Sequence, residues 1–282
     1  NHPSMFTNRT LLIATQHKKE QVIAPILESE LGVRCIVNQG FDTDTLGTFT
    51  GEIERKDDPI ATARAKCLQA MQQQNCDLGI ASEGSFGPHP DVFFLPADDE
   101  FLIFIDTKNQ IEVVVRETDF STNFAGKSVS TEEELRTFAS QVGFPSHGLI
   151  LSDAEKQWKV IYKGIQEEDV LLTHFQTIKA NSPTVFVRTD MRAMYNPTRM
   201  QVIEKAAQKL AKRLQITCPS CQTPGFDATE AIPGLPCSLC AFPTRSPISY
   251  LYTCPKCAYQ EEKKFPNGKT SEDPAHCDFC NP

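Results

Sequence analysis

The sequence has no long hydrophobic run and no secretory pattern at its start. The longest unbroken apolar stretch spans only Phe101 to Ile105, whereas a helix that crosses a membrane needs about 20 apolar residues. The first residues also lack the charged, apolar and small-residue succession of a signal peptide. We therefore expect a cytoplasmic protein with no membrane segment.

The sequence also has fewer basic than acidic residues. The chain has 28 Lys and Arg residues against 36 Asp and Glu residues, a formal net charge of -8, and the acidic residues are spread along its length. This balance disfavours a broad electrostatic attraction to nucleic acid or anionic lipid and leaves room for a local basic site. With 282 residues, 40% of them hydrophobic, the chain is long enough for one large domain and one small one.

Cysteine, in contrast, is plentiful and clustered near the C-terminus. Eight of the eleven cysteines form four Cys-x-x-Cys pairs, namely Cys218/Cys221, Cys237/Cys240, Cys254/Cys257 and Cys277/Cys280. Two thiolates on a tight turn can hold one side of a metal ion, and two such turns complete a tetrahedral four-sulfur site. The spacing predicts two structural Zn²⁺ ions, with iron–sulfur clusters and labile redox pairs as the alternatives.

The gaps between these pairs are fifteen, thirteen and nineteen residues. The simplest pairing is sequential, with the first two pairs on one ion and the last two on the other, and a crossed pairing stays open. Either pairing leaves no ligand position for water, so the sites are expected to be structural. Few aliphatic residues surround them, so metal binding, worth on the order of 10 kcal/mol per site, would replace an apolar core. The remaining cysteines, Cys35, Cys67 and Cys76, are expected in the core.

The C-terminal stretch is also unsuited to phosphate. Residues 215–282 hold five Lys and Arg residues against seven Asp and Glu residues, and a four-thiolate zinc adds further negative charge. Nucleic acid is therefore an unfavoured partner. Contact with a protein partner, a homodimer, or support of the preceding domain fits this composition better.

Short apolar strands alternate with helical stretches from the start to about Leu214, which is typical of an α/β domain. We predict an α/β domain over residues 1–214, with a mixed sheet and flanking helices, and a small zinc-ribbon domain over 215–282. The strands are expected at 10–15, 33–38, 77–82, 101–105, 111–117, 148–151, 159–162 and 184–188. The helices are expected at 18–31, 58–74, 130–142 and 167–179, with a last amphipathic helix through Leu214. Residues 39–51 read as a loop and 83–88 as a turn-rich segment.

Ligands of open α/β sheets bind beyond the carboxyl ends of the strands. The polar residues that follow the strands are His17, Lys18, Lys19, Glu83, Asp190 and Arg192. Arg64 and Lys66 lie on the helix after Asp58, and the loop before it carries Glu52, Glu54 and Asp57. Carboxylates beside cations are what a magnesium-dependent reaction on a phosphate ester requires. The alternative is that these are solvated charges at loop ends.

Two features of this set stand out. Glu83 lies between an apolar strand and two glycines that allow another group to approach closely. Asp190, Arg192 and Arg199 could close a cleft with one carboxylate and two anion-binding groups, or they could be a buried ion pair that fixes the last helix.

The segment Asp58-Pro59-Ile60-Ala61-Thr62-Ala63-Arg64-Ala65-Lys66-Cys67, followed by Asp77-Leu78-Gly79-Ile80-Ala81-Ser82-Glu83-Gly84-Ser85-Phe86-Gly87, resembles the inosine/xanthosine triphosphatase family. Members carry an Ala-Arg-x-Arg/Lys helix and then a strand that ends in an acidic residue and glycine. The opening Ala14-Thr15-Gln16-His17-Lys18-Lys19 is similar in place to that family's Thr-x-Asn-x-x-Lys phosphate loop. Here His17 replaces the asparagine and Lys19 lies one position early.

The resemblance covers residues 10–90 and implies a nucleotide-hydrolase fold with Mg²⁺ or Mn²⁺. It implies that Glu83 is a metal ligand or base and that Lys19, Arg64 and Lys66 contact phosphate. The chain as a whole also resembles a group of uncharacterised bacterial proteins, a likeness that implies no activity.

Three functions are compatible with the sequence. The first is a metal-dependent hydrolase of nucleotides or related phosphorylated small molecules. Its catalytic residues are Glu83 and Asp190, and its substrate-binding residues are His17, Lys19, Arg64, Lys66, Arg192 and Arg199. The second is a non-catalytic binding protein of the same fold that docks a protein partner through its zinc ribbons. The third, nucleic-acid binding, is disfavoured by the acidic balance.

Overall fold

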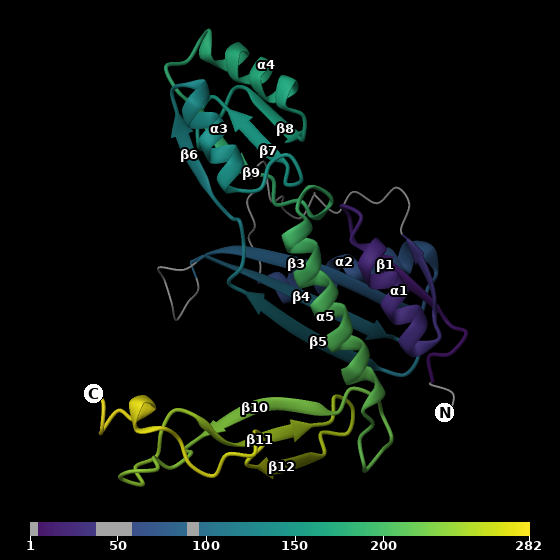
Figure 1. Ribbon diagram of the computed structural model, residues 1–282. Helices are drawn as coiled ribbons and strands as arrows, with labels where there is room; N and C mark the ends of the chain where they lie inside the picture. Colours follow the sequence, from purple (N-terminus) through teal and green to yellow (C-terminus); the bar gives the residue numbers. More distant parts are fainter. Residues whose placement is uncertain (1–4, 38–57, 89–95) are drawn as a thin grey trace. The chain divides into compact units, whose positions relative to one another are not determined.

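The computed structural model describes residues 5–37, 58–88 and 96–282, and the chain divides into two compact units (Figure 1). The first unit comprises Asn1–Lys108 and Val114–Leu210, and the second comprises Asn109–Val113 and Ala211–Pro282. The boundary between them lies inside the last long helix. The predicted loop at 39–51 and the acidic residues Glu52, Glu54 and Asp57 lie outside the described residues.

The first unit contains a five-stranded sheet that includes the N-terminal strands, except that residues 111–113 at the start of its last strand belong to the second unit. Its strands are β1 (Thr10–Ala14), β2 (Arg34–Val37), β3 (Leu78–Pro88), β4 (Pro96–Asp106) and β5 (Ile111–Asp119), in the order β2-β1-β3-β4-β5. Strands β2, β1 and β3 are parallel, and β4 runs antiparallel to β3. The sequence prediction of a mixed sheet with α/β connections is confirmed for this part of the chain.

Helices α1 (Glu20–Leu31) and α2 (Pro59–Gln74) connect the parallel strands, and both have clear local start or stop signals. The Asp58 carboxylate accepts a hydrogen bond from the Ala61 N–H at 3.3 Å, and Pro59 occupies the first helical position. Gly32 ends α1 at a φ of 67°. One face of α2 packs against the sheet through Ala63, Cys67, Ala70 and Met71. Cys67 therefore lies in the core, as expected.

Strand β3 continues well past the predicted end. The expected turn over residues 83–88 is wrong, because these residues pair with β4 up to Pro88↔Pro96. Glycine and proline are local turn signals, and a long-range partner strand overrides them here. Strand β1 pairs with β3 up to Ala14↔Ala81. The residues after Ala81 therefore lie where β1 has ended, beside the start of α1.

A second sheet in the first unit is formed by the middle of the chain. Its strands are β6 (Gly126–Val129), β7 (Leu149–Ser152), β8 (Ile161–Ile165) and β9 (Val185–Thr189), in the antiparallel order β6-β9-β7-β8. Helices α3 (Glu132–Gln141) and α4 (Glu168–Lys179) lie against this sheet (Figure 1). They bury Leu135, Phe138, Leu171 and Phe175 in its core. The strands predicted for one mixed sheet thus divide between two sheets. The N-terminal cap of α3 is Thr131 with Glu134, one residue later than the sequence suggested.

Helix α5 (Pro197–Gln215) follows a short 3-10 turn, η2 (Ala193–Tyr195). The buried Asn196 fixes its start, because its side-chain oxygen accepts the Arg199 N–H at 3.0 Å and its amide nitrogen donates to the Asn123 side chain at 2.8 Å. The predicted apolar face is buried and includes Ile203, Ala207 and Leu210.

The second unit has strands that the sequence analysis did not predict. They are β10 (Asp227–Pro233), β11 (Pro247–Thr253) and β12 (Gln260–Lys264), an antiparallel sheet that is followed by η3 (Pro274–His276). Its apolar core is small and centres on Phe226, Cys218 and Cys254. None of the helices in the described ranges is long and apolar enough to cross a membrane.

Candidate functional site

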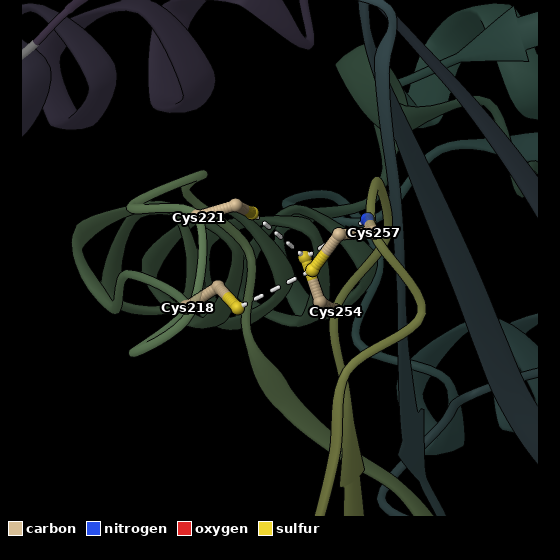
Figure 2. Close-up of side chains that lie close together, drawn as sticks. All are labelled: Cys218, Cys221, Cys254 and Cys257. Carbon is tan, nitrogen blue, oxygen red and sulfur yellow. Dashed lines mark hydrogen bonds between the residues drawn. The ribbon is translucent and has the colours of Figure 1, made fainter.

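The eight paired cysteines gather into two groups of four. One group is Cys218, Cys221, Cys254 and Cys257, and the other is Cys237, Cys240, Cys277 and Cys280. Figure 2 shows the first group, in which the two Cys-x-x-Cys turns face each other. The first turn therefore combines with the third and the second with the fourth. The sequential pairing is wrong.

The antiparallel strands of the second unit explain the crossed pairing. Strand β10 carries the chain away from the first cysteine turn toward the second, and β11 brings it back, since Asp227 pairs with Thr253. The third turn, which directly follows Thr253, thus arrives beside the first. A parallel bridge between Cys237 and Glu272 places the fourth turn, which follows Glu272, near the second.

The sulfur positions fit a tetrahedral metal. The Sγ–Sγ distances are 3.7 Å for Cys218–Cys257 and 3.6 Å for Cys221–Cys254 in the first group. In the second group they are 3.9 Å for Cys237–Cys280 and 3.7 Å for Cys240–Cys277. Four sulfurs about 2.3 Å from a central ion lie about 3.8 Å apart, whereas a disulfide requires about 2.05 Å. All eight thiols are free. Each group could hold a metal ion.

Backbone N–H groups of the turns donate to two of the sulfurs. The Leu239 N–H donates to Cys237 Sγ at 3.4 Å, and the Lys256 N–H donates to Cys254 Sγ at 3.4 Å. The residue after the second cysteine is left-handed in three of the turns, with φ values of 59° at Gln222, 60° at Ala241 and 58° at Ala258. The sequence therefore repeats one turn geometry, which presents two sulfurs to the same point.

Paired substitutions test the crossed arrangement. We expect Cys221→Ser and Cys257→Ser together to remove the same single metal ion as either change alone, because both remove ligands from one group. Cys221→Ser with Cys240→Ser should remove both ions. Native mass spectrometry of the intact chain counts the bound ions. A sequential arrangement would reverse the two results.

A second candidate site lies in the first unit, where charged side chains are buried. We call it the charged cluster, and its members are Lys19, Lys66, Ser82, Glu83, Asp98, Glu100 and Arg199. None of these residues is more than 6% exposed. They come from the start of α1, from α2, β3 and β4, and from the first turns of α5. Charged side chains are almost never fully buried unless they are paired, so this concentration is unusual.

The strand register sorts the cluster onto two faces of the sheet. Gly84 pairs with Glu100 and Phe86 with Asp98, so Asp98 and Glu100 lie on the same face as Ser82. On this face the Lys19 ammonium donates to the Ser82 hydroxyl at 2.8 Å. Glu83 points to the opposite face, where it accepts a hydrogen bond from the Lys66 ammonium.

Arg199 occupies the centre of the first face. Its Nε donates to Glu100 Oε1 at 2.6 Å and its Nη1 to the Met191 carbonyl oxygen at 2.5 Å. The guanidinium also lies 4.9 Å from the centre of the Phe86 ring. Gly84 is required here, because a Cβ at this position would lie 2.5 Å from Glu100 Oε1 and 2.7 Å from Arg199 Nη2.

Burial and neighbouring charges shift the protonation of this region. Burial and the Arg199 charge lower the pKa of Lys19 to about 8. Burial, followed by the charges of Lys19, Arg199 and Arg192, lowers the pKa of His17 to about 3, so its imidazole is neutral at pH 7. Burial and repulsion by Glu100 raise the pKa of Asp98 to about 8.

The structure brings together most of the residues that the sequence singled out. Lys19, Lys66, Glu83 and Arg199 belong to the charged cluster, and the pKa of His17 responds to the nearby cations. Arg64 lies half-buried on α2.

Asp190 is held by other groups. It forms an ion pair with Arg192 at 2.6 Å and accepts the Gly164 N–H at 3.0 Å. Two alternatives were open for Asp190, Arg192 and Arg199, namely a charged cleft or a buried ion pair. The geometry favours the ion pair, which Asp190 and Arg192 form just before the last helix. A catalytic role for Asp190 stays a prediction.

Sequence reasoning missed Asp98 and Glu100. The predicted strand began at Phe101, and the acidic residues before it, a residue type that is uncommon in strands, were assigned to no element. No apolar–polar alternation marks this start of the strand, because Asp98, Asp99 and Glu100 are three consecutive acidic residues. Their place in a strand follows only from the partner strand, which extends past Glu83.

The charged cluster predicts a pH-dependent stability. The pKa of Asp98 rises from its usual 3.8 to about 8 on folding, so the native state keeps a proton that the unfolded state releases between these values. The wild type should therefore lose stability as the pH rises through this window. We expect Asp98→Asn, which does not titrate, to gain stability relative to the wild type from about pH 5 to about pH 8 and to hold that gain above it.

Urea denaturation of both proteins without divalent cations measures this difference in the free energy of unfolding. Glu133→Gln, a change on α3 away from the cluster, is the control. A difference between wild type and Asp98→Asn that does not vary with pH would contradict the assignment.

An α/β unit with a buried charged cluster, joined to a small module with two four-cysteine groups, is the class of protein that the fold and the sites define. The chain belongs to the family of the domain of unknown function DUF6671, whose model matches residues 66–282. The matched range includes Lys66, Glu83, Asp98, Glu100, Arg199 and all eight paired cysteines. No curated protein matches the chain.

Proposed function

We propose that this protein is a metal-dependent hydrolase of nucleotides or related phosphorylated small molecules. The observation that carries the proposal is the charged cluster. It places three carboxylates and three cationic side chains around the region where β1 ends and β3 continues. Ligands of α/β sheets bind at such strand ends, and phosphate transfer requires both kinds of charge.

The energetic cost of burying these charges supports a functional role for the cluster. Taking an ion out of water costs several kcal/mol even when it is paired, and apolar residues of similar volume would often be as stable. Asp98 and Lys19 also have strongly shifted pKa values with identified causes. Such shifts concentrate at sites of chemistry.

The positions of the cations suit a phosphate. Lys19 lies at the start of α1, where no side chain caps the helix among the described residues, and the positive end of a helix dipole favours an anion. Arg199 supplies a second positive charge on the same face. His17 and Lys18 hold left-handed backbone conformations, with φ values of 65° and 61°. Non-glycine residues adopt this conformation at some energetic cost, and such strain clusters at functional sites.

Glu83 is the side chain that we assign to proton transfer. The Lys66 ammonium donates a hydrogen bond to its carboxylate and holds it in place, and a positioned carboxylate can accept a proton from an attacking water. A divalent cation, when bound, would neutralise phosphate charge. The resemblance to the inosine/xanthosine triphosphatases supports the same assignment, because two residues that it singles out, Lys66 and Glu83, are in direct contact.

A hydrolysis screen tests the proposal. We expect the purified chain to release phosphate or pyrophosphate from at least one nucleoside di- or triphosphate when Mg²⁺ or Mn²⁺ is present, and Glu83→Gln to reduce turnover by at least about a hundredfold. The control variant Glu133→Gln should retain full activity. Turnover that is absent from the wild type across the panel, or is equal in the Glu83→Gln variant, would refute a catalytic Glu83.

Glu83→Gln leaves the Lys66 charge buried without a carboxylate, so this variant is also expected to be less stable. Activity is therefore compared below the melting temperature of each protein, with the fold checked by circular dichroism.

We further propose that each four-cysteine group binds one structural zinc ion. Four sulfurs at near-tetrahedral spacing are typical of structural zinc sites. The second unit has a small apolar core, so metal binding would supply much of its folding energy, on the order of 10 kcal/mol per site. Neither group would take part in the hydrolysis.

Removal of zinc should unfold the second unit selectively. After treatment with a strong chelator we expect hydrogen exchange to rise sharply in β10, β11 and β12 and to stay slow in β1, β3 and β4. Mass spectrometry of peptides from both units measures the exchange, and elemental analysis confirms the loss of zinc. A protein that contains no zinc as purified, or one whose second unit stays protected after chelation, would contradict this assignment.

A further inference from the structure

Three buried oxygen atoms of the charged cluster have no hydrogen-bond partner in the described part of the chain. They are both carboxylate oxygens of Asp98 and the Oε2 atom of Glu100. Asp98 is 1% exposed and Glu100 is fully buried. Leaving a buried acceptor without a donor costs about 1–3 kcal/mol, and more for a charged group. Native proteins rarely tolerate such groups unless a ligand, an ion or a water satisfies them.

These oxygens belong to one face of the sheet. Asp98 and Glu100 are two residues apart on β4, so their side chains project in the same direction, about 7 Å apart at the backbone. Across from Glu100 lies Gly84, whose missing side chain leaves room for the Glu100 carboxylate and the Arg199 guanidinium to lie against the strand. Two carboxylates at this separation can both reach one ion.

The hydrogen bond from Arg199 fixes the orientation of the Glu100 carboxylate. Arg199 binds one of its oxygens, Oε1, at 2.6 Å, and the other oxygen has no partner among the described groups. A basic residue that fixes a carboxylate through one oxygen while the second binds a metal is a common outer-shell arrangement. Arg199 is itself fixed by the Met191 carbonyl oxygen.

The charges that face Asp98 come from Glu100, Arg199 and Lys19. Arg199 is paired with Glu100, and Lys19 is hydrogen-bonded to the neutral Ser82. Repulsion between two carboxylates in a buried place is relieved when a cation binds to both. Glu83 is less suited to this role, because it points to the other face and is engaged by Lys66.

We infer that Asp98 and Glu100 form the binding site of one divalent cation of the kind that prefers oxygen ligands, such as Mg²⁺ or Mn²⁺. The role of this cation rests on the proposed function, because the hydrolysis would use it. The inference assigns the cation to β4 rather than to Glu83. Two carboxylates leave coordination positions for water and for the oxygens of a phosphate, which is the usual form of such sites.

Manganese binding to the zinc-loaded, full-length chain tests the site without any substrate. Titration with Mn²⁺, followed by the loss of the free-ion signal in electron paramagnetic resonance, should give one site per chain that excess Mg²⁺ competes for. We expect Asp98→Asn to weaken the affinity at least about tenfold, because the amide keeps the shape and loses the charge. Glu83→Gln should change it less than about twofold.

Asp98→Asn is the main variant, because it leaves the buried ion pair between Arg199 and Glu100 intact. Glu100→Gln is less informative, since it would leave the buried Arg199 unpaired. Asp98→Ser serves as the second variant should the asparagine fail to fold.

A wild type that binds no Mn²⁺ would overturn the inference, as would a chain that loses Mn²⁺ on Glu83→Gln and keeps it on Asp98→Asn. The proposed hydrolase fails separately. A chain that binds Mn²⁺ through Asp98 yet hydrolyses no nucleotide would refute the catalytic proposal alone, and a hydrolase whose Mn²⁺ affinity is unchanged by Asp98→Asn would refute the cation site alone.

Discussion

The buried ion pair between Arg199 and Glu100 is the interaction on which the arrangement of the charged cluster depends. Both side chains are fully buried, and each would cost several kcal/mol to bury without the other. The pair joins the first turn of α5 to β4, although 99 positions separate the two residues in the sequence. It also requires glycine at position 84, because a larger residue there would collide with both groups.

Much of the rest of the cluster follows from this constraint. Once Arg199 holds one oxygen of Glu100, the second oxygen and both oxygens of the neighbouring Asp98 are left buried without a hydrogen-bond partner among the described residues. Lys19 and Lys66 bring positive charge to the two faces of the same strand. The result is a region that carries both signs of charge in a place of low dielectric, where electrostatic interactions are strong. A site of this kind can bind a cation and an anion together, as a metal–phosphate complex requires.

The sequence predicted those features that depend on local chemistry. Asp58 and Pro59 start α2 and Gly32 ends α1 at the positions expected, because caps act within one turn of the chain. The secondary structure of residues 83–88 could not be predicted in the same way. Their glycines and proline indicate a turn, and their pairing with β4 depends on a strand whose start was itself hidden by Asp98 and Glu100. The two errors have one cause.

The cysteine module shows the same division between local and distant information. The Cys-x-x-Cys spacing was enough to identify the four turns, since each turn is built from adjacent residues. It did not determine which turns meet, because the antiparallel run of β10 and β11 decides that by returning Thr253 to Asp227. No strand was predicted here from the sequence, although β11 contains Ile248, Tyr250, Leu251 and Tyr252. The apolar core of this unit is small, so hydrophobic periodicity carries little information there.

Anomalous diffraction from crystals soaked in manganese chloride tests the central claim, that the charged cluster is built to hold a ligand, most directly. The account predicts one manganese peak in the first unit, within coordination distance of carboxylate oxygens of both Asp98 and Glu100, with Arg199 still bound to Glu100. A charged cluster without a peak, with Asp98 and Glu100 sharing a proton instead, would contradict it.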